Sequence, residues 1–143
     1  MESGWLLFAL LSAIFASLVA IFGKVGLQGV DSNVATAVRA VIMALFLLGV
    51  LLLQGKLGEV SAVTSNSVAM KYIVLSGVAG ALSWLFYFLA LKLGKASQVA
   101  PIDRLSVVFT IVLAAILLGE RVTAKIAVGG LLIVVGALII ALG

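Results

Sequence analysis

Five apolar stretches, each about 20 residues long, account for most of the chain. A hydrocarbon core about 30 Å thick needs about 20 apolar residues at a rise of about 1.5 Å each. Charged or turn residues bound the stretches, which cover residues 5–23, 34–53, 72–91, 99–118 and 126–143. We therefore predict an all-α membrane protein with five transmembrane helices in a single domain, because the rest of residues 1–143 supplies only short connections.

The composition excludes most soluble functions. Of 143 residues, 65% are hydrophobic and 10% are charged, whereas a soluble domain carries about a quarter charged residues. The chain has no Cys and no His, and it shows neither a phosphate-binding glycine loop nor metal-ligand spacing. We expect no enzymatic activity, no cofactor and no metal. The net charge of +4 does not predict nucleic-acid binding, because the basic residues stand singly between apolar stretches.

Two of the five stretches admit another interpretation. The first could be a signal peptide, but its leader has no Lys or Arg and its apolar run is too long, so we predict that it is retained. The fourth could be a re-entrant or interfacial segment, because its apolar run after Arg104 extends only over residues 105–119. This leaves a four-span arrangement as the alternative to five spans.

The Lys and Arg residues divide almost evenly between the two faces of the membrane. The face of the N-terminus has four, Lys56, Lys71, Arg121 and Lys125, and the other face has three, Lys24, Lys92 and Lys95. Because an excess of Lys and Arg on the cytoplasmic side sets orientation, this near tie predicts dual topology. A single orientation, fixed by one loop or by the insertion machinery, stays open.

Three charges lie inside predicted spans: Arg39 in the second, and Asp103 and Arg104 in the fourth. An unpaired charge there costs about 2.5 to 3.5 kcal/mol on insertion scales. Both spans start from the same face, so a pair such as Arg39 with Asp103 is open. Alternatively, the arginines extend to the lipid headgroups. The functional interpretation is a polar vestibule that attracts or coordinates a substrate.

Other residues extend this interpretation to a substrate pathway. Asp103, Ser106 and Thr110 form one polar stripe on a helix of period 3.6, which should face protein or water. We expect Pro101 in the first turn of this helix and Ser97 as its cap.

In the third span, aromatic residues share a helix face with small ones. Trp84 and Tyr87 offer a stacking or cation–π surface to an organic ligand, and Gly77 and Gly80 on the same face permit close helix approach. The alternative is that these residues only fill a packing interface between helices.

Several segments together resemble the EamA domain of the drug/metabolite transporter superfamily. They are Ala100-Pro101-Ile102-Asp103-Arg104-Leu105-Ser106-Val107-Val108, Leu118-Gly119-Glu120-Arg121, Lys24-Val25-Gly26 and Gly29-Val30-Asp31-Ser32-Asn33. The resemblance covers nearly the whole chain. Typical members carry two such five-helix repeats, whereas this chain looks like the single-repeat, half-size form of bacteria and archaea.

The last span is similar to the last helix of small multidrug resistance transporters. Gly129 and Gly136 match its seven-residue glycine spacing, which implies that they form a contact in an antiparallel dimer. The family's carboxylate in the first helix is absent here, where Ala16 and Ser17 stand instead. Proton-coupled cation exchange by that mechanism is therefore not implied, and Asp103 is the only acid inside a predicted span.

The sequence therefore predicts a transporter in the inner (plasma) membrane that moves a small organic solute by alternating access as a homodimer. Arg39 would hold an anionic group such as a carboxylate, Trp84 and Tyr87 would bound the cavity, and Asp103 with Arg104 would form a gate. A membrane scaffold or subunit of a larger complex is the alternative, as is a flippase for lipid-linked substrates.

Overall fold

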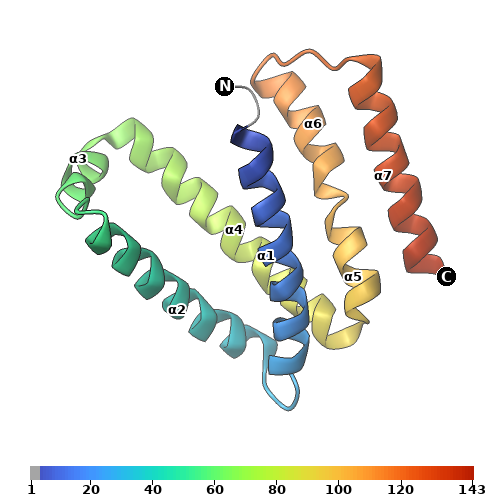
Figure 1. The fold of residues 1–143 in the computed structure, drawn as a ribbon, viewed down its shortest axis with the longest axis horizontal. Coiled ribbons are helices and arrows are strands. Elements are labelled where there is room, and N and C mark those ends of the chain that lie inside the picture. The colour runs from blue at the N-terminus through green and yellow to red at the C-terminus, as the bar shows by residue number, and fades with distance from the viewer. Residues whose placement is uncertain (1–3) are drawn as a thin grey trace. The chain divides into compact units, whose positions relative to one another are not determined.

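The computed structural model describes residues 4–143, which form helices joined by short turns (Figure 1). Five helical segments of this part of the chain are long and apolar enough to cross a membrane. The predicted all-α fold with five transmembrane helices is thereby confirmed. The helices are α1 (Gly4–Gly26), α2 (Ser32–Leu53), α3 (Glu59–Ser65), α4 (Ser67–Leu93), α5 (Ala96–Asp103), α6 (Ser106–Leu117) and α7 (Ala124–Leu142).

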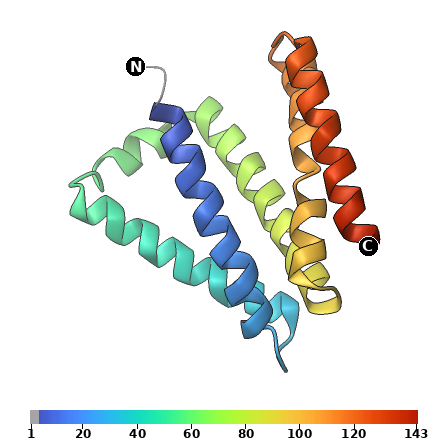
Figure 2. The same cartoon turned by 45° about the vertical axis from the view of Figure 1, so that its right-hand side comes forward.

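The chain divides into two compact units. The first consists of residues up to Lys24 and from Leu93 onward, and the second of Val25–Lys92. In the first unit, α5 and α6 follow one another and α7 returns beside them in the opposite direction (Figures 1 and 2). In the second unit, α2 and α4 run in opposite directions and α3 joins them (Figure 1). The leader before the first span falls mainly on residues 1–3, outside the described residues.

Side chains next to the helix starts fix where α2 and α7 begin. The carboxylate of Asp31 accepts hydrogen bonds from the N–H groups of Asn33 at 2.9 Å and Val34 at 3.0 Å. These hydrogen bonds hold the pKa of Asp31 below its usual 3.8, and the bond from Val34 has the larger effect. They do so because they favour the charged form of the carboxylate. At α7, the Thr123 hydroxyl accepts from the N–H of Ile126 at 3.3 Å, as expected of an N-cap residue.

The fourth span starts differently from the sequence expectation. We expected Ser97 as the cap and Pro101 in the first turn, and both expectations are wrong. The helix α5 begins at Ala96 after Lys95, which makes no side-chain cap bond, and Pro101 lies inside the helix. The physical reason is the short turn that ends α4: only Gly94 and Lys95 separate the two helices, so the next helix starts before Ser97 can cap it.

A break between α5 and α6 follows shortly after Pro101. Pro101 has no N–H to donate to the carbonyl of Ser97, which weakens the helix there. The N–H of Arg104 is then shared by the carbonyls of Ala100 at 3.3 Å and Pro101 at 3.1 Å, and the N–H of Leu105 donates to Ile102 at 3.0 Å. Such three-residue steps tighten the turn. The expected continuous stripe from residue 103 to residue 110 is therefore divided between two helices.

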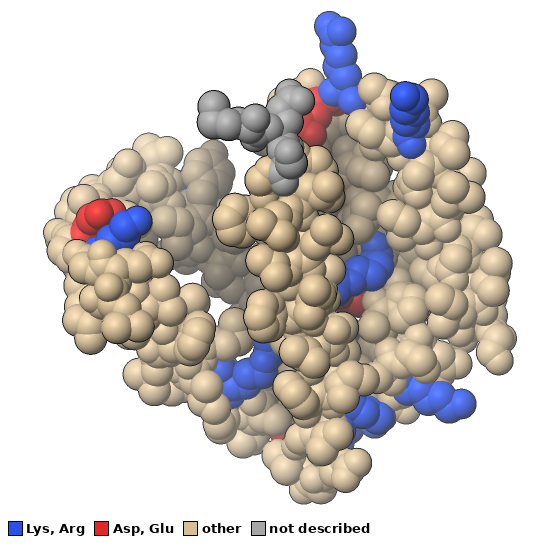
Figure 3. All heavy atoms as spheres, in the orientation of Figure 1, with Lys and Arg blue, Asp and Glu red and all other residues tan. Residues whose placement is uncertain are grey.

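Most large apolar side chains of residues 4–143 point away from the protein. Ala20, Leu27, Phe88, Leu91 and Ala137 are the apolar residues that are buried. An apolar surface of this extent requires lipid or another chain to cover it. Charged side chains appear only as isolated spots on the face shown in Figure 3.

Candidate functional site

Arg39 is a charged residue held within a membrane-crossing helix. It lies seven residues after Ser32, where α2 begins, which places it about 10 Å along the helix at 1.5 Å per residue. The side chain is half-buried. Its Nη1 is buried and has no hydrogen-bond partner among residues 4–143.

Two aromatic rings of α4 cover this guanidinium. Its central carbon lies 3.0 Å from the centroid of the Trp84 ring and 4.6 Å from that of Phe88. The two rings are nearly parallel, with an interplanar angle of 12° and centroids 6.0 Å apart. Trp84 and Phe88 are four residues apart and so share one face of the helix. The cation–π contact thus joins α2 to α4 within the second unit.

The aromatic contact offsets only part of the cost of burying the charge. Cation–π interactions contribute about 0.5 to 2 kcal/mol, whereas a charged side chain in a membrane helix costs up to about 2.5 to 3.5 kcal/mol on insertion scales, the full figure applying at the helix centre. A buried donor without a partner adds its own desolvation penalty. The described neighbours of Arg39 leave this donor unpaired, so an additional acceptor with a negative charge would lower its energy.

Tyr87 completes the aromatic side of the cluster. Its ring meets that of Phe88 edge-on, at an interplanar angle of 69° and with the ring centroids 6.0 Å apart. The structure thus brings together three residues that the sequence placed on the substrate pathway, Arg39, Trp84 and Tyr87. A Cβ at Gly77 or Gly80 would meet no atom of the described residues within 4 Å, so no described helix makes the close approach expected there.

The other predicted pathway residues belong to the first unit. Asp103 ends α5 and is half-buried, whereas Arg104, Ser106 and Thr110 are exposed. Arg104 lies in the break, between the last residue of α5 and the start of α6. A gate formed by Asp103 and Arg104 stays a prediction.

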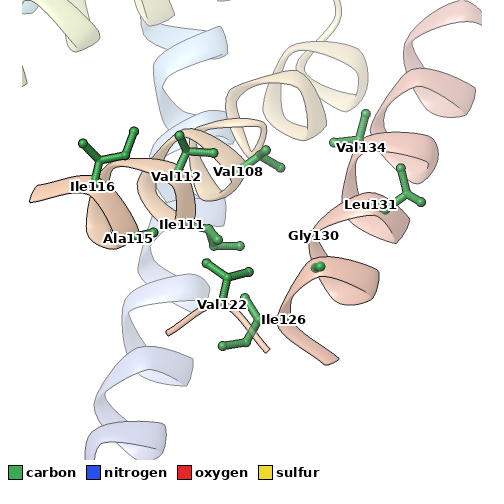
Figure 4. A pocket seen from close by; sticks show the side chains of 11 residues that line it. Val108, Ile111, Val112, Ala115, Ile116, Val122, Ile126, Gly130, Leu131 and Val134 are labelled. Carbon is green, nitrogen blue, oxygen red and sulfur yellow. The ribbon is translucent and has the colours of Figure 1, made fainter. Parts of the chain in front are cut away.

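An apolar groove lies between α6 and α7 in the first unit, beside the place where the two helices contact each other (Figure 4). Its volume of about 420 Å³ is in the range of small-molecule pockets. The lining offers no charged or hydrogen-bonding side chain, and none of the predicted pathway residues belongs to it. It therefore lacks the few polar groups that orient a solute in a ligand pocket. The groove is lined by Val108, Ile111, Val112, Ala115, Ile116, Val122, Ile126, Ala127, Gly130, Leu131 and Val134.

Comparison with known proteins connects this helical arrangement to transport. Residues 3–142 match the EamA-like transporter family. The chain belongs to this family. An uncharacterized transporter in the cobO 3' region of a Sinorhizobium species is 38% identical over 141 residues, which cover 99% of each chain. No solved structure matches.

The similarity extends over both compact units of this EamA-like chain. Because the Sinorhizobium relative is covered over 99% of its own length, it too has the length of one five-helix repeat. The resemblance noted from the sequence is thus confirmed.

The glycines of the last helix in this EamA-like protein differ in their surroundings. A Cβ added at Gly129 or Gly136 would meet nothing within 4 Å, whereas a Cβ at Gly130 would lie 3.4 Å from Cδ1 of Ile111. Gly130 thus packs against α6. Gly129 and Gly136 leave room for a neighbour from outside the described chain, and a dimer contact there stays a prediction.

Sequence reasoning missed one member of the cluster, Phe88. The ring is buried, with 3% of its surface exposed, and it forms the second aromatic surface beneath the guanidinium. Its position four residues after Trp84 was a usable signal, since residues at this spacing are neighbours on a helix. The spacing could not reveal that Arg39 of another helix lies over both rings.

Proposed function

We propose that this chain is a non-enzymatic transporter of the inner (plasma) membrane that moves a small organic solute by alternating access as a homodimer. The observation that carries the proposal is the Arg39 cluster: a half-buried guanidinium from a membrane-crossing helix lies over two aromatic rings, and its buried Nη1 has no hydrogen-bond partner among the described residues. Charged residues inside membrane spans usually mark substrate or ion pathways. Membership of the EamA-like transporter family supports the same conclusion.

A second copy of the chain would supply the other half of the transporter. Many transporters are built from two repeats of inverted topology, with the substrate site at their interface. This chain has the length of one repeat, and so does its relative. Nearly balanced loop charges would allow two copies to insert in opposite orientations. An antiparallel homodimer would then provide both repeats, with Gly129 and Gly136 at the contact between its last helices.

Within each copy, the predicted pathway residues would have different roles. Arg39, Trp84 and Tyr87 would contact the solute. Asp103 and Arg104 would form the gate, and Ser106 with Thr110 would line the route beyond it. The alternating motion would be a rocking of one bundle against the other around the site.

Transport by the purified full-length protein in proteoliposomes tests the proposal. The probes are radiolabelled benzoate, a radiolabelled amino-acid mixture and the fluorescent cation ethidium. We expect uptake of at least one probe above that of protein-free liposomes, and a loss of at least tenfold for Arg39→Gln. Lys56→Gln, in the exposed turn between α2 and α3, is the matched control. Folded protein that moves none of the three probes would contradict the proposal, and a fully active, stable Arg39→Gln variant would remove Arg39 from the pathway.

A further inference from the structure

The Arg39 cluster has a geometry that restricts what can bind to it. A guanidinium is planar, and its five N–H donors lie in that plane. The Trp84 ring, 3.0 Å from the central carbon, covers one face of the plane. A ligand must therefore approach at the edge, where Nη1 is buried and has no hydrogen-bond partner among the described residues.

The charge of the cluster selects the sign of the ligand. The guanidinium lies against the rings of Trp84 and Phe88, and neither of these side chains can carry a negative charge. The nearby hydroxyl of Thr36, one turn earlier in α2, donates to the carbonyl of Ser32 at 2.7 Å. The cluster thus supplies a positive charge and a free donor but no described acid to balance them.

We infer that this cluster binds one organic oxyanion, a carboxylate or a phosphate monoester, at the edge of the Arg39 guanidinium. An oxyanion supplies both the acceptor and the counter-charge, and its two oxygens match the fork of N–H donors. A neutral amide would supply an acceptor without the charge, and an organic cation would be repelled. The inference deepens the proposed function, on which it rests for the claim that the bound anion is transported.

Trp84 provides an optical signal for binding. The chain has two tryptophans, Trp5 and Trp84, so Trp5→Phe leaves Trp84 as the single tryptophan. An anion that binds to Arg39 changes the charge directly over this ring. We expect the emission of Trp84 in the full-length Trp5→Phe protein, excited at the red edge of its absorption, to change saturably with benzoate or with phenyl phosphate.

Matched ligands and variants give the test its specificity. Benzoate and phenyl phosphate separate a carboxylate from a phosphate ligand. Benzamide and benzyltrimethylammonium, a neutral and a cationic analogue, should produce no saturable change. Arg39→Gln should abolish the response, and Arg39→Lys should weaken apparent affinity at least tenfold, because Lys keeps the charge but lacks the planar fork. Lys56→Gln removes a positive charge outside the cluster and should respond like the parent.

Several results would overturn the inference. They are the absence of a saturable signal with both anions, an equal response to benzamide, and an unchanged anion response in Arg39→Gln. If Arg39→Gln does not fold, Arg39→Lys decides, and an undiminished affinity in that variant overturns the inference. The tests of anion binding and of transport can fail independently. Transport without any anion signal refutes only the inference. An anion signal without transport of any probe refutes only the proposed function.

Discussion

At the scale of single residues, Arg39 illustrates what a sequence reveals about a membrane site. Its charge within an apolar stretch was enough to identify it as a candidate, because such a residue needs a partner. The partner itself was not predictable. The sequence left open an ion pair with Asp103 or an extension to the headgroups, whereas the structure places the guanidinium on Trp84 and Phe88. That contact depends on which helices are neighbours, and hydropathy does not encode this.

Asp31 allows a prediction on pH dependence. Its folded-state pKa lies below the usual 3.8, because the N–H groups of Val34 and Asn33 bind the carboxylate. A lowered pKa stabilises the folded state above the unfolded value, and this contribution disappears as the pH falls through the folded-state value. We expect Asp31→Asn to melt below the parent at pH 7. The difference should shrink from pH 3.8 downward, as measured by thermal unfolding of the detergent-solubilised protein.

The control for this prediction is Glu59→Gln, which removes an exposed carboxylate at the start of α3. It should leave the melting temperature of the parent nearly unchanged at pH 7. A melting difference between Asp31→Asn and the parent that grows toward low pH would show that the carboxylate does not stabilise the folded state in its charged form.

At the scale of elements, hydropathy located the spans well and their ends less well. The third span was predicted over residues 72–91, and α4 covers Ser67–Leu93. Asn66 explains the earlier start, because its side chain accepts a hydrogen bond from the N–H of Ala69 at 3.1 Å and so caps the helix. A polar residue at a helix end lowers the mean hydropathy of a window, so hydropathy alone places the boundary too far inward.

The break between α5 and α6 yields a prediction about Pro101. Replacing it with Ala restores an N–H that can donate to the carbonyl of Ser97 and removes a ring that crowds the preceding turn. Proline costs about 3 kcal/mol in a helix interior. We expect Pro101→Ala to raise the melting temperature, and to slow transport at least severalfold because a continuous helix resists bending. Melting and proteoliposome uptake are the two measurements.

Ser97→Ala is the control, because it changes the same turn and leaves the backbone of residue 101 as it is. It should melt and transport like the parent. Faster transport by Pro101→Ala would contradict the expectation that the break between α5 and α6 lets the helix bend during transport. A lower melting temperature would contradict the expectation that Pro101 destabilises the helix.

The packing of α6 against α7 gives a second prediction at this scale. At Gly130 an added Cβ would lie at 3.4 Å from Ile111 and 3.9 Å from Val108, which are ordinary contact distances. Gly130→Ala should therefore be tolerated, and it gains up to about 1 kcal/mol of helix propensity. Gly130→Ile should separate the helices and cost about 1 to 3 kcal/mol, as overpacking does. Thermal unfolding of the three proteins provides the comparison.

Gly49→Ile in α2 is the matched control, since a Cβ at Gly49 meets nothing within 4 Å among the described residues and Gly49 has no place in the proposed dimer contact. This variant should keep the stability of the individual chain. The packing account is wrong if Gly130→Ile melts at the same temperature as the parent, or if Gly49→Ile and Gly130→Ile are destabilised equally.

At the scale of the whole molecule, few charges have to specify orientation. Lys and Arg number 9 and Asp and Glu number 5 in 143 residues. The exposed apolar surface places the helices in a membrane, but it does not determine which of their ends faces the cytoplasm. Only the Lys and Arg residues near the helix ends carry that information, and they divide almost evenly. One added charge should therefore be able to shift the orientation.

Reporter fusions at the C-terminus test this expectation in bacterial cells. A fluorescent protein reports a cytoplasmic C-terminus, and alkaline phosphatase reports an external one. We expect both reporters to be active on the parent chain. Glu120→Lys adds a positive charge between α6 and α7 and should raise phosphatase activity severalfold, since it draws the N-terminal face to the cytoplasm. Gln28→Lys adds one between α1 and α2 and should raise fluorescence instead.

Glu120→Gln separates the added lysine from the lost carboxylate. Acidic residues contribute little to orientation, so this variant should keep the ratio of the two reporters. A parent chain with only one active reporter, or opposite lysines that shift the ratio in the same direction, would exclude dual topology. An antiparallel pair would then require a different partner chain, because copies that all insert one way cannot supply both halves of an inverted repeat.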